Sequence, residues 1–301
     1  MKHNLKIIAV LLGMFLITQF IGLYVINHYS HEENKLPFGM ENPKLENDSD
    51  YYSLFPSIIF AFVFAVLLLF LLNKFDAAFI LKTWFFIIII IALSISFSVV
   101  TSKLGFEKTF FQIPLFAVAI ALPLALVKVY KREFIIHNIT ELFIYPGIAA
   151  VFVPLLNVVT IIFLLVLISI YDMWAVWKSG IMQKMAKYQI EKLNIFGGFF
   201  IPYLSKKDEL KFKNMAKSEL KKKKIKVNLA ILGGGDVIFP IITAGVMFVR
   251  FGFISALFVI LGAALGLSYL FFFSEKEKFY PAMPFISAGI FLGMIASYFF
   301  A

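Results

Sequence analysis

The sequence has no cysteine and little charge, and each shortage excludes a class of protein. Without cysteine among its 301 residues, the chain forms no disulfides, no thiolate nucleophile and no Cys-ligated metal site. Charged residues occupy 15% of the positions and hydrophobic residues 61%, which is not the balance of a water-soluble domain. At roughly 20 residues per membrane crossing, this apolar content suffices for about nine helical spans. The sequence therefore predicts a polytopic membrane protein.

The apolar residues stand in unbroken runs, without the alternation of a membrane β-barrel, so helices are the spanning structure that remains. We predict an all-α fold with nine transmembrane helices in a single integral membrane domain of residues 1–301, and a basic cytoplasmic loop at 178–226. The fifth and sixth spans are divided near Pro154 and Asn157, because one helix would exceed the bilayer thickness. The predicted spans are residues 5–26, 54–72, 80–100, 110–129, 134–155, 158–177, 227–249, 253–273 and 280–300.

The positive charges predict the orientation of these spans. Of the 28 Lys and Arg, 23 fall on the side of the N-terminus and five on the other side. The positive-inside rule then gives a multi-pass protein of the cell membrane, with a cytoplasmic N-terminus and an extracytoplasmic C-terminus. Attraction to anionic lipid headgroups explains the basic loop, and no nucleic acid is expected as a partner.

Two acidic residues within the spans have no packing role. Asp172 lies near the end of the sixth span and Asp236 within the seventh, and a carboxylate costs roughly 2.5 to 3.5 kcal/mol at a helix centre on insertion scales. With alternating spans, Asp172 lies about five residues and Asp236 about nine residues from the cytoplasmic end of its helix. The two side chains are therefore expected to meet at similar depth.

A pair of carboxylates in a low-dielectric site shares one proton, so that one member can act as a base and the other as an acid. This is the chemistry of aspartic proteolysis, and we expect no metal and no cofactor. No His-Glu-x-x-His motif is present for a metalloprotease. The alternative, which the two acids by themselves leave open, is an ion-coupled transporter or leak channel that uses the same carboxylates.

Two short motifs accompany the acids. Gly233, Gly234 and Gly235 directly precede Asp236, where they permit close backbone approach or form a helix-packing face. Pro281, Ala282, Met283 and Pro284 open the ninth span. Their prolines keep the chain non-helical and expose backbone groups, although proline is also ordinary at a helix start.

Together these residues resemble the presenilin and signal peptide peptidase family of intramembrane aspartyl proteases. The resemblance rests on Tyr171-Asp172, on Gly233-Gly234-Gly235-Asp236, which is similar to the family's Gly-x-Gly-Asp, and on Pro281-Ala282-Met283-Pro284, which is similar to its Pro-Ala-Leu motif. Met283 departs from the family's Leu by a volume-conserving swap. The short tails and modest loop look like those of a compact microbial member.

The resemblance implies roles for these residues. Asp172 and Asp236 would be the catalytic pair, Gly233 and Gly235 would shape the backbone beside Asp236, and Tyr171 would position the pair or the substrate. The segment from Pro281 to Met283 would support the active site and recognise substrate. The implied partners are proteins with a transmembrane helix or signal-peptide remnants, together with membrane lipid, and a homo-oligomer is left open.

The resemblance also bears on the segment before the seventh span. Val227 to Leu232 would add a strand to an unwound substrate helix, satisfying backbone groups that would otherwise be orphaned. The plainer alternative is a membrane-surface loop. The apolar island Leu193 to Leu204 would plug the site or be self-cleaved.

Overall fold

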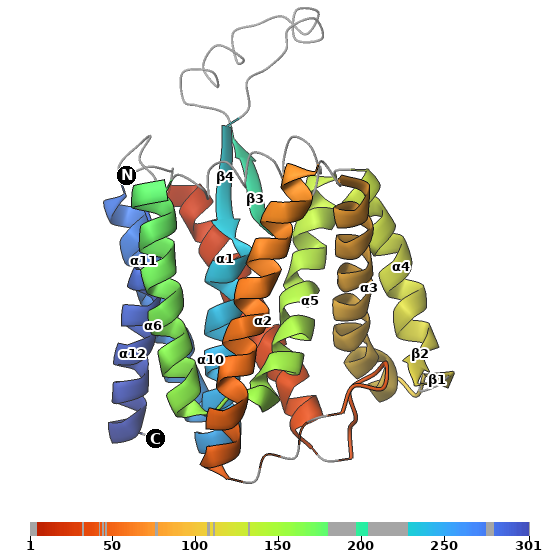
Figure 1. The fold of residues 1–301 in the computed structure, drawn as a ribbon, viewed down its shortest axis with the longest axis horizontal. Coiled ribbons are helices and arrows are strands. Elements are labelled where there is room, and N and C mark those ends of the chain that lie inside the picture. Colours follow the sequence, from red (N-terminus) through yellow and green to blue (C-terminus); the bar gives the residue numbers. More distant parts are fainter. Residues whose placement is uncertain are drawn as a thin grey trace, which may run out of the picture.

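The protein is described by a computed structural model that covers residues 5–31, 33–41, 43, 45, 47–75, 78–106, 109–110, 112–131, 133–179, 197–203, 228–274 and 280–300. Within these residues lie nine α-helices, which run side by side, with the two chain termini at opposite ends of the bundle (Figure 1). They are α1 (Leu5–Ser30), α2 (Asp48–Lys74), α3 (Ala78–Lys103), α4 (Leu115–Tyr130), α5 (Phe134–Phe152), α6 (Val158–Trp174), α10 (Gly234–Phe251), α11 (Phe253–Phe273) and α12 (Met283–Phe300).

Eight of the helices in the described part of the chain are long and apolar enough to cross a membrane. The remaining one, α4, is equally apolar in character but has 16 residues. The all-α prediction is therefore confirmed, with eight candidate spans and one shorter apolar helix in the places of the nine predicted spans. Most of the predicted loop at 178–226 lies outside the described residues.

The break between α5 and α6 lies where the sequence predicts it. A 3₁₀ turn, Val153–Leu155, contains Pro154, and Asn157 then caps α6. The Asn157 side chain accepts a hydrogen bond from the Thr160 backbone N–H at 2.9 Å, and the Thr160 hydroxyl accepts one from the Asn157 N–H at 2.9 Å. This reciprocal pair is a capping box, which satisfies two of the N–H groups that a helix start leaves without partners.

Two antiparallel hairpins accompany the helices. The pair β1 (Thr109–Phe110) and β2 (Ile113–Pro114) precedes α4, and β3 (Gly198–Tyr203) pairs with β4 (Asn228–Gly233). The second hairpin lies at the same end of the bundle as the N-terminus, and β4 continues directly into α10 (Figure 1).

Three predicted helix starts are wrong, two of them because a strand precedes the helix. The seventh helix begins at Gly234 instead of residue 227, the fourth at Leu115 instead of residue 110, and the ninth at Met283 instead of residue 280. For the seventh, Leu229 to Leu232 is a short apolar run of the kind that periodicity cannot assign to strand or helix. Partner strand β3, which is distant in sequence, decides the outcome. At the ninth, Pro281 delays the helix.

Helix α10 is the centre of the largest apolar core. It contacts α1, α5, α6, α11 and α12, and every residue from Pro240 to Met247 is buried. By contrast, no residue of α2 between Asp48 and Leu68 is buried, and the main neighbours of this helix are α3 and α6. The residues that follow Asp236 are thus enclosed by protein, and α2 lies at the periphery.

Helices α11 and α12 approach each other more closely than any side chain would allow. An added Cβ at Gly262 or Gly266 of α11 would overlap the backbone of Gly289 or Phe285, and one at Gly289 or Gly293 would overlap the backbone of α11. Both helices therefore carry the small-xxx-small spacing that favours tight packing within a membrane. This pairing fixes the start of α12 relative to the rest of the bundle.

Candidate active site

The two intramembrane aspartates lie at the same end of the bundle. Asp172 is in the last turn of α6, and Asp236 is the third residue of α10, with which α6 is in contact. The two carboxyl groups are close enough for the charge of Asp172 to act on Asp236. The structure corrects the predicted depth of Asp236, which lies in the first turn of its helix and not about nine residues inside it, because residues 228–233 form a strand.

Asp172 is held by the start of α12. Its side chain is only 9% exposed, and its Oδ2 accepts a hydrogen bond from the Met283 backbone N–H at 3.0 Å. The Ala282 N–H also lies within hydrogen-bonding reach of this carboxylate. A helix N-terminus presents unpaired N–H groups and a partial positive charge, both of which favour a carboxylate. The Pro281-to-Pro284 motif therefore supplies backbone donors to Asp172.

Asp236 is held mainly by its own turn. Gly233 is the N-cap of α10, and its backbone N–H lies within reach of the Asp236 carboxylate three residues later. This is the geometry in which an acidic residue at the third helical position closes back on the cap. Asp236 as a residue is half-buried.

The three glycines differ in what they leave room for. A Cβ at Gly233 would lie 3.1 Å from Oδ2 of Asp236, and one at Gly234 would lie 2.7 Å from the hydroxyl oxygen of Tyr145. A Cβ at Gly235 would meet only the ring of Phe239, at an ordinary 3.8 Å. The steric demand for glycine thus falls on positions 233 and 234.

Tyr171 packs against α2. Its ring is 38% exposed and packs edge-on against Phe62 of α2, with the ring centroids 6.5 Å apart, and beside Trp174. This tyrosine is close enough to interact electrostatically with Asp172. This ring contact joins the peripheral helix α2 to the helix that carries Asp172.

The β3–β4 hairpin leads directly to Asp236. Gly198 pairs with Gly233 in the strand register, and the Gly234 N–H donates to the Gly197 carbonyl at 3.1 Å. The membrane-surface loop considered for Val227 to Leu232 is therefore wrong for Asn228–Gly233, which is a strand. Of the apolar island Leu193 to Leu204, residues 198–203 form β3, and 193–196 and 204 lie outside the described residues.

Sequence reasoning missed two polar contacts next to the site. The Gln19 amide of α1 donates to the Val237 carbonyl at 3.1 Å, one residue beyond Asp236. Ser169 of α6 donates to Ser287 of α12 at 3.0 Å, near the bond between Asp172 and Met283. Gln19, Ser169 and Ser287 are polar residues within apolar runs, and this was the signal that the sequence offered.

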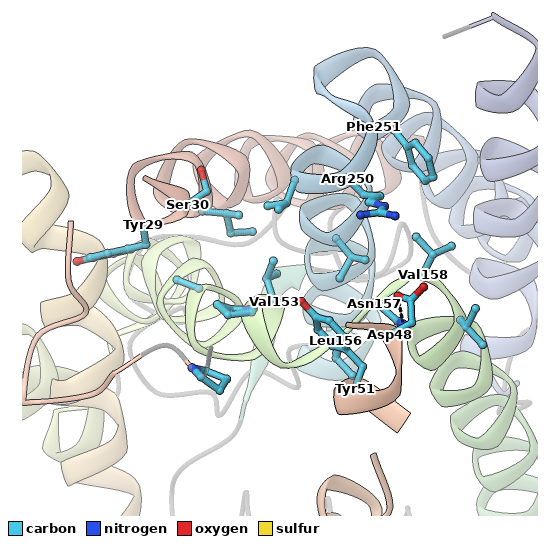
Figure 2. Close-up of a pocket in the computed structure, with 17 residues that line it drawn as sticks. Tyr29, Ser30, Asp48, Tyr51, Val153, Leu156, Asn157, Val158, Arg250 and Phe251 are labelled. Carbon is cyan, nitrogen blue, oxygen red and sulfur yellow. Dashed lines mark hydrogen bonds between the residues drawn. The ribbon is translucent and has the colours of Figure 1, made fainter. Parts of the chain in front are cut away.

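A separate cavity of about 480 Å³ lies at the opposite end of α10. Figure 2 shows Arg250 on the same side of this cavity as Asn157 and Asp48, which hydrogen bond at 3.1 Å, with Tyr29 and Ser30 of α1 across from them. The aspartate pair lies at the other end of the bundle, so this cavity is not part of the candidate site. Among the described residues, no group of three His, Asp or Glu has the arrangement of a metal site.

Comparison with known proteins decides the family. A family model described as "Signal-peptide peptidase, presenilin aspartyl protease" matches residues 12–301. The chain belongs to this family. The match contains both aspartates, the three glycines and the segment from Pro281 to Pro284. No curated protein matches the sequence.

Solved structures of this presenilin family share the fold. One is a "presenilin family intramembrane aspartate protease in C222 space group", which matches with a TM-score of 0.59 and 18% identity over 98% of this chain and 99% of that one. A second, described in P2 space group, has the same TM-score and identity over 97% of each chain. The presenilin-like fold prediction is confirmed, and neither comparison supports the transporter alternative.

Proposed function

We propose that Asp172 and Asp236 are the catalytic pair of this presenilin-family protease, in its Gly-x-Gly-Asp type. The observation that carries the proposal is their placement: two carboxyl groups from different helices interact at one end of the bundle. The chain belongs to a family of aspartyl proteases. Both aspartates are buried or half-buried as residues, in a site away from bulk water. Such a pair can divide the roles of acid and base between its members.

The reaction follows from a pair that holds one proton. The ionised carboxyl takes a proton from water as the water oxygen attacks the peptide carbonyl carbon, and the protonated carboxyl gives its proton to the carbonyl oxygen. The tetrahedral carbon then expels the amine: the nitrogen gains the proton of the protonated carboxyl as the C–N bond breaks. One hydroxyl of that carbon returns a proton to the other carboxylate, which leaves a carboxylic acid and a pair that again holds one proton. The backbone N–H groups of Ala282 and Met283 hold Asp172 in place through these steps.

The substrates we propose are transmembrane helices of membrane proteins or signal-peptide remnants. A helix has to unwind before its peptide carbonyls become accessible, and the released backbone groups need new partners in a membrane. Strand β4 offers them. The far edge of β3 is occupied at Phe200 by Asn138, which donates to its carbonyl at 2.7 Å and accepts from its N–H at 2.9 Å, so we assign substrate pairing to β4.

The orientation and surroundings of the enzyme also belong to this proposal. The excess of Lys and Arg on the side of the N-terminus supports a cytoplasmic N-terminus and an extracytoplasmic C-terminus. The aspartate pair lies at the end of the bundle that holds the N-terminus (Figure 1), so cleavage is assigned to the cytoplasmic half of the substrate helix. Contacts with membrane lipid and a homo-oligomer fit the same setting.

The test is cleavage of a single-span substrate by the purified protein in liposomes. Wild type should release two fragments, and Asp172→Ala and Asp236→Ala should release none. A matched control is Asp48→Ala, which removes a carboxylate at the other end of the bundle and should leave cleavage unchanged. Full activity of either active-site variant would refute the pair, and ion flux without proteolysis would refute the function.

A further inference from the structure

A buried cluster of ionisable side chains lies between α4 and α5, and the proposed reaction does not use it. Lys128 of α4 contacts Glu141 of α5 with Nζ and Oε1 2.6 Å apart, and its Nζ lies 3.2 Å from Nδ1 of His137. All three side chains are buried. Buried ionisable groups are costly unless they are paired, and in a membrane they usually mark a functional site.

The cluster is directed at β3. The imidazole Nε2 of His137 lies 2.8 Å from the Gly198 carbonyl oxygen, and the Gly198 N–H donates to Oε1 of Glu141 at 3.4 Å. Asn138, on the same helix, holds both backbone groups of Phe200. Helix α5 therefore fixes the strand whose partner β4 runs into the Asp236 turn.

Tyr145 extends this polar face toward the aspartate. Positions 137, 141 and 145 follow one another at four-residue spacing, so their side chains share one face of α5. The Tyr145 ring packs edge-on against Phe199, 5.9 Å between centroids. Its hydroxyl is buried beside Glu141 and within electrostatic range of Asp236, and it makes no hydrogen bond of ordinary geometry.

The hydroxyl also touches the turn itself. Its oxygen would be 2.7 Å from a Cβ on Gly234, so it occupies the space that the glycine leaves open, two residues before Asp236. A buried hydroxyl without a partner is unfavourable, and hydrogen bonds of a catalytic site often tighten only when substrate is bound. This donor thus lies within reach of Glu141 and within electrostatic range of the carboxylate that is proposed to react.

We propose that Tyr145 is a positioning residue, whose hydroxyl donates a hydrogen bond to the Asp236 carboxylate in the substrate-bound enzyme. The cluster of Lys128, His137 and Glu141 fixes the position of this tyrosine relative to the β3–β4 hairpin. The inference rests on the proposed role of Asp236. It adds a residue that lies outside the three motifs on which the family resemblance stands.

The test is a comparison of Tyr145→Phe with Tyr29→Phe. Both changes remove one buried hydroxyl and keep the ring. Tyr29, however, lies in the last turn of α1, at the end of the bundle away from the aspartates, and its hydroxyl donates to the Ile95 carbonyl at 2.9 Å. With a single-span substrate in liposomes, Tyr145→Phe should lower kcat by about tenfold to 100-fold with little change in KM, since small misplacements of reacting groups have effects of this size. Tyr29→Phe should leave kcat unchanged.

A second variant tests the cluster that holds Tyr145. Glu141→Gln keeps the size of the side chain and removes its charge, so it should lower kcat in the same direction, and the double variant with Tyr145→Phe should lose less than the two separate losses combined. Wild-type kcat in Tyr145→Phe, or a rise in KM alone, would overturn the inference. If wild type cleaves and Asp236→Ala does not, such a result contradicts only the proposed role of Tyr145 and leaves the aspartate pair in place. If wild type itself does not cleave, the proposed function fails first.

Discussion

The two aspartates meet at one end of the bundle but are held in different ways. Asp172 accepts a hydrogen bond from Met283, 111 residues further along the chain. Asp236 is held by Gly233, three residues before it, in the turn that joins β4 to α10. Asp236 also sits in the first turn of its helix, where the helix dipole favours a negative charge, whereas the helix of Asp172 continues beyond it as a π-helical turn, Ala175–Ser179.

The two aspartates are therefore positioned by different parts of the structure. The position of Asp172 depends on how α12 packs, which the glycines shared with α11 determine. The position of Asp236 depends on a glycine turn and on the hairpin that α5 holds. Changes in one set should therefore disturb one aspartate and leave the other in place, and the following experiments test this separation.

The largest effect should come from crowding the turn of Asp236. In Gly234→Ala the new methyl group would lie 2.7 Å from the Tyr145 oxygen, so the turn or the buried Tyr145 ring has to move, and we expect the cleavage rate to fall by about 100-fold. The matched control is Gly235→Ala, where the nearest atom is 3.8 Å away, and we expect its rate to stay within about threefold of wild type. Greater damage at position 235 than at 234 would contradict this account of the turn.

The next effect should come from removing the donor to Asp172. Met283→Pro deletes the N–H that binds Oδ2 at the first position of α12, where proline is tolerated by the helix. A hydrogen bond to a charged group contributes about 1.5 to 3 kcal/mol, so cleavage should slow by about tenfold to 100-fold. Met283→Leu keeps the N–H and should cleave like wild type. Equal rates in the two variants would show that this bond does not matter for catalysis.

A smaller effect is expected at the hairpin. Asn138→Ala removes both hydrogen bonds to Phe200, which should lower the free energy of unfolding in detergent by about 1 to 3 kcal/mol. Asn138→Asp keeps the acceptor for the Phe200 N–H but places a carboxylate oxygen against the Phe200 carbonyl, so its loss should be at least as large. If neither variant is less stable than wild type, α5 does not anchor the hairpin.

The smallest effect is expected at Tyr171. Since its ring packs on Phe62 and lies partly exposed, Tyr171→Phe keeps the contact between α6 and α2 and should change the cleavage rate by less than about twofold. Tyr171→Leu removes the aromatic contact and should have the larger effect. A severe loss in Tyr171→Phe would instead show that the hydroxyl acts on Asp172 or on the substrate.

Much of the fold could be predicted from the sequence because it depends on local patterns. Unbroken apolar runs specify membrane helices, and Pro154 with Asn157 specifies the break between α5 and α6. The β3–β4 hairpin could not be predicted, since Leu229 to Leu232 forms a strand only through pairing with residues 198–203. This long-range contact displaced the start of α10 and with it the predicted depth of Asp236.

The site was predictable to the extent that its residues stand in motifs. Asp172 and Asp236 are conspicuous as acids in apolar helices, and the prolines around Met283 indicated free backbone groups. Glu141 is also an acid within a predicted span, but nothing in the sequence linked it to His137 or Tyr145, because only the packing of α4, α5 and β3 brings these side chains together. The unequal demands on Gly234 and Gly235 likewise depend on a side chain from another helix.

The most direct test of the aspartate pair is the cleavage rate of Asp172→Asn, Asp236→Asn and the double variant, with one single-span substrate in liposomes. Asparagine keeps the shape of each side chain and removes its proton chemistry. Residues that act as one catalytic unit have non-additive effects, so each single variant should be slower than wild type by at least about 1000-fold, and the double variant no slower still. Substantial activity in either single variant, or losses that add in the double variant, would contradict a shared reaction centre.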